Sequence, residues 1–222
     1  DGTSNKHVLG ANAMLGVSLA CAKAAAQSED LPLYNYLQKA FNFPALTKNL
    51  PLPMMNIING GRHADTKLKV QEFMIVPHML GSDGKVDTEE CVRVGAEVFH
   101  HLGGLLKSEK LDTDVGNEGG YAPDIDTAER ALNFITAAIT NAGYTPGKEV
   151  SLALDVAASE FFSQGKYSWE DKKLSSSDMK SVYKEFLKKD DFKKDTLFIC
   201  KNYETKENLS KIGFNVKIIN EY

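Results

Sequence analysis

The chain has 222 residues and a formal net charge of −4, with 42% hydrophobic and 25% charged residues. These values are typical of a soluble globular protein and exclude a disordered or fibrous chain. The slightly acidic balance argues against a protein that binds nucleic acid or a membrane surface, because both usually need a basic face. No apolar run approaches the roughly 18 residues that a membrane-spanning helix needs, so no membrane span is expected.

The cysteines indicate the cellular compartment of the protein, and the first residues indicate whether the chain is part of a longer one. Cys21, Cys91 and Cys200 are odd in number and far apart, and no C-x-x-C pair occurs. Zinc and disulfide frameworks are therefore not expected, and the predicted compartment is the reducing cytoplasm. The polar start lacks an initiator Met and a signal-peptide pattern, so we expect the chain to be the middle of a longer protein.

The first part of the chain is predicted to be helical. Residues 11–27 are rich in alanine, which favours helix and lets neighbouring backbones approach, so we expect a buried packing helix. A stretch punctuated by proline follows over 32–53. We place a domain boundary near Thr47, with residues 1–46 in one domain and 47–222 in another.

A pair of strands begins the second domain. Residues 54–58 are predicted to form a strand that ends in an Asn59-Gly60 turn, and residues 71–77 form its expected neighbour. Glu72 and Phe73 are adjacent in the second strand, so their side chains should face opposite sides of it.

Two amphipathic helices follow, each with a predicted capping box at its N-terminus. Asp87 and Glu90 begin the first helix, and Asp126 and Glu129 begin the second, which should stop at Gly143. The apolar stripe of the first helix runs through Cys91, Val94, Val98, Leu102 and Leu105.

Residues 150–156 then read as a buried strand. A hairpin followed by alternating helix and strand is the rhythm of an α/β barrel, which sets the expected fold class. Lysines become dense after Lys166. In this later part we expect a helix carrying Met179, Val182 and Phe186, a strand over 196–200, a helix over 204–212 and a strand over 214–219.

Four groups in these segments are candidates for chemistry, and each has an alternative interpretation. Asp155 ends an apolar strand, which in a barrel is the catalytic rim, but it could equally cap the next helix. Glu118 lies in Gly-Asn-Glu-Gly-Gly, where a carboxyl can act as a general acid or simply be exposed in a surface turn. His63 follows an Asn-Gly-Gly turn and could be a loop residue. Glu72 could be a solvated strand residue.

The order and spacing of these segments carry more weight than any one of them. Asn-Gly-Gly-Arg-His-Ala at 59–64, Gln-Glu-Phe-Met at 71–74, Val-Gly-Asn-Glu-Gly-Gly at 115–120 and Leu-Asp-Val-Ala-Ala-Ser-Glu at 154–160 resemble the first part of the enolase barrel. Gly-Ala-Asn-Ala-Met-Leu-Gly-Val-Ser at 10–18 resembles the end of the enolase small domain. The resemblance implies a partial enolase-type β/α barrel, preceded by the tail of a small α+β N-terminal domain.

The resemblance also implies an activity and a set of site residues. Enolases are phosphopyruvate hydratases, lyases that interconvert 2-phosphoglycerate and phosphoenolpyruvate in glycolysis with Mg²⁺, commonly as homodimers. By similarity Asp155 is a magnesium ligand, and Glu118 is the catalytic general acid with Glu72 beside it. His63, Glu72 and Gln71 are substrate contacts.

The same comparison predicts that this chain is incomplete and inactive alone. After the strand at 196–200 the family pattern has a carboxylate, whereas Lys201 and Asn202 stand here, and the tail from about residue 188 diverges. The family's lysine base and later substrate-binding groups have no assigned counterpart. The alternative is a truncated, non-catalytic enolase-like binding protein.

Overall fold

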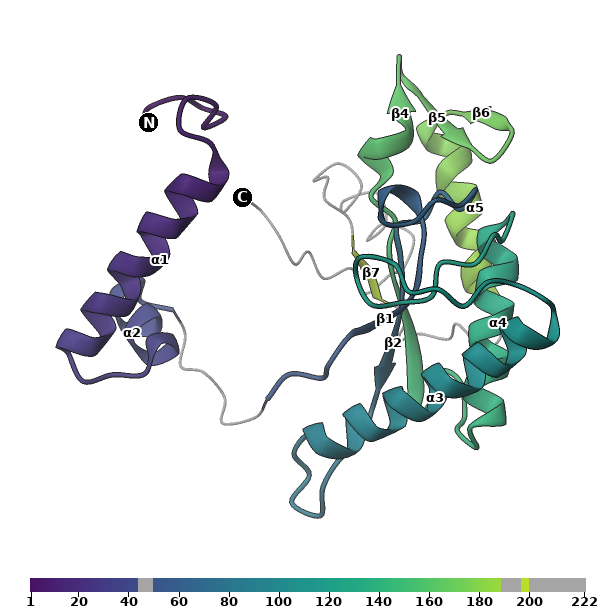
Figure 1. The fold of residues 1–222 in the computed structure, drawn as a ribbon, viewed down its shortest axis with the longest axis horizontal. Helices are drawn as coiled ribbons and strands as arrows, with labels where there is room; N and C mark the ends of the chain where they lie inside the picture. The colour runs from purple at the N-terminus through teal and green to yellow at the C-terminus, as the bar shows by residue number, and fades with distance from the viewer. Residues whose placement is uncertain (44–49, 189–196, 200–222) are drawn as a thin grey trace. The chain divides into compact units, whose positions relative to one another are not determined.

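The computed structural model describes residues 1–43, 50–188 and 197–199. The chain divides into two compact units, residues 1–49 and 50–222, and each is described by itself. Figure 1 shows the helical first unit and the mixed second unit. The predicted boundary at Thr47 lies outside the described residues.

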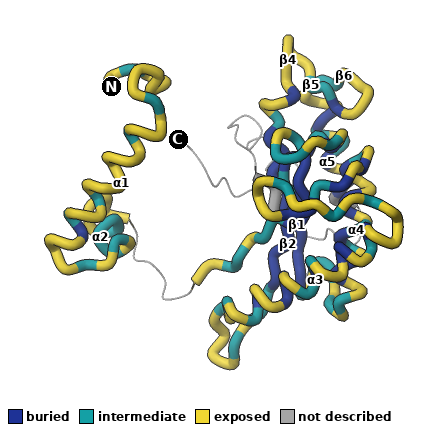
Figure 2. Tube along the Cα trace, in the orientation of Figure 1, coloured by how far each residue is buried: buried dark blue, intermediate teal, exposed yellow. Residues whose placement is uncertain are grey.

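The first unit contains two helices, α1 (Ala11–Ser28) and α2 (Leu33–Ala40), which pack against each other. The predicted helix is present, but the expectation that it is buried is wrong. Ala26 is its only buried residue, and α1 is almost entirely exposed in Figure 2. Its alanines lie on every face, so no apolar stripe concentrates the burial, and the short α2 covers little of it.

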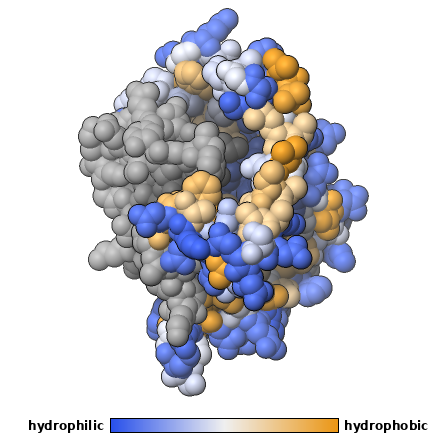
Figure 3. Space-filling model, turned by 90° about the vertical axis from the view of Figure 1, so that its left-hand side faces the viewer, coloured by the Kyte–Doolittle hydropathy of each residue, from blue (hydrophilic) through white to orange (hydrophobic). Residues whose placement is uncertain are grey.

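Large apolar side chains of α1 are therefore not covered by the described part of the first unit itself. Leu15 is 57% exposed and Val17 67% exposed. The face of the molecule drawn in Figure 3 likewise mixes hydrophobic and hydrophilic side chains.

The second unit is built on a four-stranded sheet in the order β1-β2-β3-β7. Its strands are β1 (Met55–Asn59), β2 (Glu72–Pro77), β3 (Val150–Asp155) and β7 (Leu197–Ile199). β2 pairs antiparallel with both β1 and β3, and β3 pairs parallel with β7. The predicted hairpin and buried strand are confirmed to within a residue. The described strands form an open sheet, as expected of a partial α/β barrel.

Two helices, α3 (Thr88–Ser108) and α4 (Ala128–Asn141), cover one face of this sheet (Figure 1). The core between them contains the strand residues Phe73, Ile75 and Leu154, all fully buried. The predicted stripe of α3 is confirmed by four buried members, Cys91, Val94, Val98 and Leu102, and by Leu105, which packs against the core.

The predicted helix caps have different outcomes. Asp87 Oδ1 accepts a hydrogen bond from the backbone N–H of Glu90 at 3.0 Å, which confirms Asp87 as the first cap. The return bond of the predicted capping box is not formed, because Asp87 N donates to Met79 O at 3.0 Å. The second cap was placed one residue too early. Thr127 caps α4, because its Oγ1 accepts from Arg130 N at 3.3 Å. Asp126 instead lies 3.8 Å from the Arg130 guanidinium.

A second, smaller sheet was not predicted. It consists of β4 (Phe162–Ser163), β5 (Lys166–Trp169) and β6 (Lys172–Leu174), in that order. Its single tryptophan, Trp169, is 3% exposed and packs against Phe161 and Phe186, with ring centroids 5.8 and 6.2 Å away. Short strands of two to four residues leave too little alternation for a sequence pattern to reveal.

The last described helix, α5 (Ser176–Lys188), confirms the predicted one, with Met179 and Phe186 buried and Val182 packed against the core. β7 confirms the central part of the strand expected over 196–200. The helix expected over 204–212, the strand over 214–219 and Lys201 lie outside the described residues.

Candidate functional site

Three polar side chains form a row across the sheet at one edge. Asn59 of β1 is in register with Glu72 of β2, and Glu72 is in register with Asp155 of β3. Cross-strand partners have Cβ atoms about 4.5–5.5 Å apart and point to the same face. The row therefore faces away from α3 and α4, on the same side as Met74, Val76 and Ala153.

Asp155 occupies the last position of β3 and is 9% exposed. Its Oδ1 accepts a hydrogen bond from the backbone N–H of Ala157 at 2.9 Å. Ala157 has a left-handed backbone, with φ of 46°, and immediately precedes the short helix η2 (Ala158–Phe161). Both interpretations of Asp155 are thus compatible with its position, since one carboxylate shapes the following turn and also belongs to the row at the strand ends.

Glu72 and Phe73 lie on opposite sides of β2, as their alternation predicts. Phe73 is fully buried in the helix-covered core, whereas the Glu72 side chain is 21% exposed. Glu72 Oε1 lies 3.6 Å from Nδ1 of His63, at the end of η1 (Gly61–His63). That distance is too long for a hydrogen bond, so the attraction requires a protonated imidazole.

Gln71 connects the start of β2 with both neighbouring strands. Its backbone N–H donates to Asp155 O at 3.1 Å, and its carbonyl accepts from Gly60 N at 2.9 Å. The residue is 8% exposed. These bonds extend the ladder one residue past β2 and place Gln71 next to the row.

Glu118 lies in the loop formed by residues 115–121, which we call the Glu118 loop. Gly116 N donates to Gly120 O at 2.8 Å, and Gly119 N donates to Gly116 O at 3.1 Å, so the loop folds back on itself. Glu118 itself is exposed at the tip. The structure thus brings His63, Gln71, Glu72 and Asp155 together at one edge and leaves the Glu118 side chain in solvent.

Sequence reasoning overlooked two features of this edge. Asn59 was interpreted only as a turn residue, yet its side chain is fully buried and hydrogen-bonded to the Glu118 loop. Arg62 of η1 forms an ion pair with Glu160 of η2 at 2.6 Å. The position of Asn59 at the end of an apolar strand could have indicated that it is buried. No sequence signal indicated the ion pair, because it joins segments almost a hundred residues apart.

Magnesium prefers several hard oxygen ligands. Asp155 offers one buried carboxylate, and Glu72 offers a second on the adjacent strand. Across residues 1–43, 50–188 and 197–199, no group of three His, Cys, Asp or Glu side chains is arranged to hold a metal ion. Because one or two carboxylates commonly hold Mg²⁺ while water and substrate oxygens complete its shell, Asp155 could serve as one such ligand.

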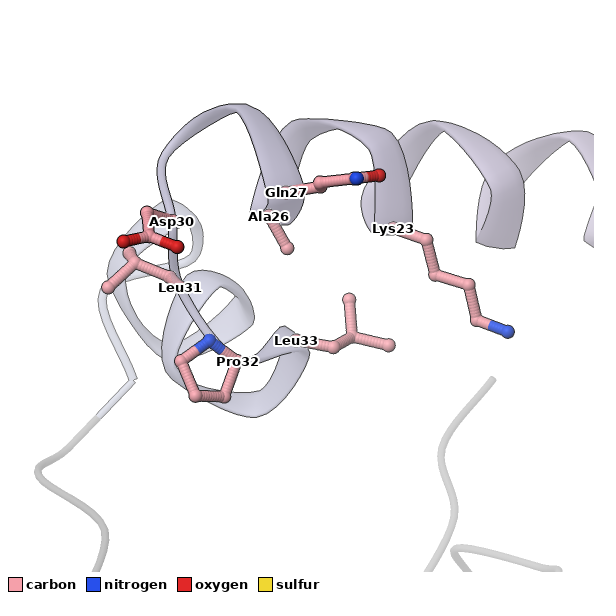
Figure 4. Close-up of a pocket in the computed structure, with 7 residues that line it drawn as sticks. All are labelled: Lys23, Ala26, Gln27, Asp30, Leu31, Pro32 and Leu33. Carbon is pink, nitrogen blue, oxygen red and sulfur yellow. The ribbon is translucent and has the colours of Figure 1, made fainter.

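A surface pocket lies in the first unit, where α1 turns into α2 (Figure 4). None of the predicted site residues contributes to it. Its lining consists of Lys23, Ala26, Gln27, Asp30, Leu31, Pro32 and Leu33. Lys23 and Asp30 are its charged groups, and nothing in their arrangement indicates acid–base chemistry.

Comparison with known protein families agrees with this architecture. Residues 47–206 match the model of the enolase C-terminal TIM barrel domain, and residues 1–37 match the model of the enolase N-terminal domain. The chain belongs to the enolase family. The row at the sheet edge lies at the C-terminal ends of β1 and β3, which is where barrel enzymes of this architecture place their active sites. Within the described part of the chain, no helix is long and apolar enough to cross a membrane.

Proposed function

We propose that this chain carries part of the active site of a phosphopyruvate hydratase, which dehydrates 2-phosphoglycerate reversibly to phosphoenolpyruvate in the glycolysis of the cytoplasm. The observation that carries the proposal is the row of Glu72 and Asp155 at one sheet edge, with His63 beside Glu72. The proposal extends to the domain division at residues 1–46 and 47–222, and to a homodimer of the full-length protein.

The roles follow from the chemistry of the reaction. Removing a proton next to a carboxylate creates an additional negative charge on the substrate, and in enolase-superfamily sites bound Mg²⁺ stabilises this ene-diolate. Asp155 would be one ligand of that metal. Glu118 would donate a proton to the leaving hydroxyl, and its exposed position leaves it accessible to a substrate.

Glu72 and the residues around it would position the substrate. Glu72 lies between His63 and Asp155, so it can accept a hydrogen bond from a hydroxyl held at the sheet edge. A protonated His63 would offer a positive charge to an anionic group of the substrate. Gln71 would contribute a neighbouring polar side chain.

We further propose that the 222-residue polypeptide is inactive by itself. Its described residues supply Asp155 without two further carboxylates around it, and Lys201 follows β7 in the sequence where the family has an acidic ligand. A cation at that position repels a metal ion. The lysine that would abstract the substrate proton has no assigned counterpart.

The test compares the protein isolated from the cells that make it with the purified 222-residue polypeptide. Both are incubated with 2-phosphoglycerate and Mg²⁺, and phosphoenolpyruvate is measured by phosphorus NMR. We expect conversion by the isolated protein, its loss with a chelator, and no conversion by the polypeptide. Glu118→Gln in the active protein should lower kcat roughly 10²- to 10⁴-fold, the range for loss of a general acid.

The matched control is Glu89→Gln, which changes an exposed glutamate in the first turn of α3 and should leave kcat unchanged. If the isolated protein does not convert 2-phosphoglycerate, the proposed reaction is wrong and the binding-protein alternative gains support. If the polypeptide alone makes phosphoenolpyruvate and Glu118→Gln abolishes it, the proposed inactivity is wrong.

A further inference from the structure

Asn59 is a fully buried polar residue at the edge that carries the site. Its Nδ2 donates a hydrogen bond to the carbonyl of Gly120 at 2.7 Å, across 61 residues of sequence. Its Oδ1 accepts from Nδ2 of Asn56 at 2.5 Å. The carbonyl of Gly120 can only accept, so it turns the NH₂ group of Asn59 toward the loop and leaves the Asn59 oxygen to accept from Asn56.

The backbone holds the same loop against β1. Asn59 N donates to Tyr121 O at 2.8 Å, and Tyr121 N donates to Ile57 O at 3.0 Å. These bonds make a parallel bridge at the end of the Glu118 loop. They position Tyr121, but the turn that carries Glu118 lies before it and is attached through the Asn59 amide.

Glycines let the loop approach Asn59 closely. A Cβ atom added to Gly116 would lie 2.3 Å from Asn59 Nδ2 and 2.9 Å from the carbonyl oxygen of His63. One added to Gly120 would lie 2.7 Å from the backbone carbon of Ile57. The two ends of the turn therefore rest directly on the end of β1, with the Asn59 amide between them.

We propose that Asn59 is a positioning residue, whose buried side-chain amide holds the Glu118 loop at the sheet edge next to Glu72 and Asp155. This inference rests on the proposed function in one respect, which is that Glu118 of the loop acts as the general acid. The anchoring itself is a property of the chain that can be measured without substrate or metal.

Asn59→Asp tests the donor rather than the packing, because aspartate has nearly the same shape as asparagine. The introduced carboxyl can donate to Gly120 O when it is protonated, whereas the ionised form cannot and repels that carbonyl. Burial and the facing carboxylate of Glu72 raise the pKa of the introduced group, whereas the hydrogen bond donated by Asn56 Nδ2 and a protonated His63 lower it. The ionised form predominates at about pH 8 and should release the loop, and lowering the pH to about 5 should restore the bond to the extent that the carboxyl becomes protonated.

The measurement is amide hydrogen exchange of a peptide covering residues 115–121, expressed at each pH relative to the unchanged chain. We expect Asn59→Asp to exchange roughly tenfold faster than the unchanged chain at the higher pH, with an increase no larger than this at the lower pH. Asn59→Leu, which can never donate, should exchange faster at both. Asn141→Asp at the exposed end of α4 makes the same chemical change away from the loop and should show no effect.

Exchange of Asn59→Asp at the original rate at the higher pH would overturn the proposal, because an ionised aspartate cannot donate to Gly120 O. A second test uses the unchanged chain, so its result does not depend on whether a variant folds. The side-chain NH₂ protons of Asn59 should exchange much more slowly than those of Asn141, and exchange at the solvent rate would equally overturn the anchoring. If anchoring holds but Glu118→Gln leaves turnover of the isolated protein intact, the proposed function fails while the anchor stands.

Discussion

At the scale of single residues, Gly103 and Gly104 of α3 have opposite surroundings. A Cβ added to Gly103 would lie 2.4 Å from Tyr121 Oη, whereas one added to Gly104 meets nothing within 4 Å. Tyr121 cannot easily move away, because its ring stacks on Phe99 at 4.1 Å and its backbone is bonded to β1. The same substitution should therefore have opposite effects at two neighbouring positions.

We expect Gly103→Ala to lower the free energy of unfolding by about 1–3 kcal/mol, through overpacking against Tyr121. Gly104→Ala should raise it by about 0.5–1 kcal/mol, because alanine restricts the unfolded chain and favours helix. Urea unfolding followed by circular dichroism measures both. A stabilised Gly103→Ala variant would show that Tyr121 yields without cost and is a weaker anchor for the Glu118 loop than its contacts indicate.

At the scale of elements, the sequence pattern and the structure assign different capping residues to the N-terminus of α4. The pattern predicted Asp126 as the cap, and the structure places Thr127 there, with its Oγ1 bonded to Arg130 N. Asp126 has only an exposed ion pair with Arg130, at 3.8 Å. The cap satisfies a helical N–H, whereas a solvated ion pair contributes little.

Thr127→Ala should therefore destabilise the protein by about 1 kcal/mol, within the usual range for lost caps. Asp126→Ala should change stability by no more than about 0.5 kcal/mol. The free energy of unfolding of both variants, measured by chemical denaturation under identical conditions, shows which of the two residues caps α4. A larger loss for Asp126→Ala would restore the capping box that the sequence pattern predicts.

At the scale of the whole molecule, the two units differ in their capacity to fold alone. The second unit has its own core of buried residues on β1 to β3, α3, α4 and α5. Among the described residues of the first unit, Ala26 is the only buried apolar one. Burial of apolar surface is the main favourable contribution to folding, so stability should reside in the second unit.

A polypeptide of residues 50–222 should thus unfold cooperatively, with a midpoint close to that of the whole chain. Trp169 is a suitable reporter, because it is the only tryptophan and is 3% exposed in the second unit. Residues 1–49 alone should show a gradual loss of helix without a cooperative transition. Loss of Trp169 burial on removing residues 1–49 would contradict this division of stability.

Local sequence signals predicted most of the elements but not what covers them. The hairpin, α3, α4 and β3 were predicted because apolar periodicity and capping residues are local signals. The alternation of Glu72 and Phe73 correctly placed one side chain in the core and the other on the opposite face. The exposure of α1 was not predicted, since alanine content reports helix propensity and says little about what covers the helix.

The family, the order of the main elements and the candidate residues could be predicted before the structure was known, because residues close together in the chain carry the motifs and periodicities. The structure was needed to show that Asn59, Glu72 and Asp155 share one row and that Asn59 is hydrogen-bonded to Gly120 of the Glu118 loop. Strand register and a hydrogen bond across 61 residues depend on how distant segments pair. Such pairing is set by the packing of the whole sheet, so a short stretch of sequence can mark a residue such as Asn59 as unusual but cannot identify its partner.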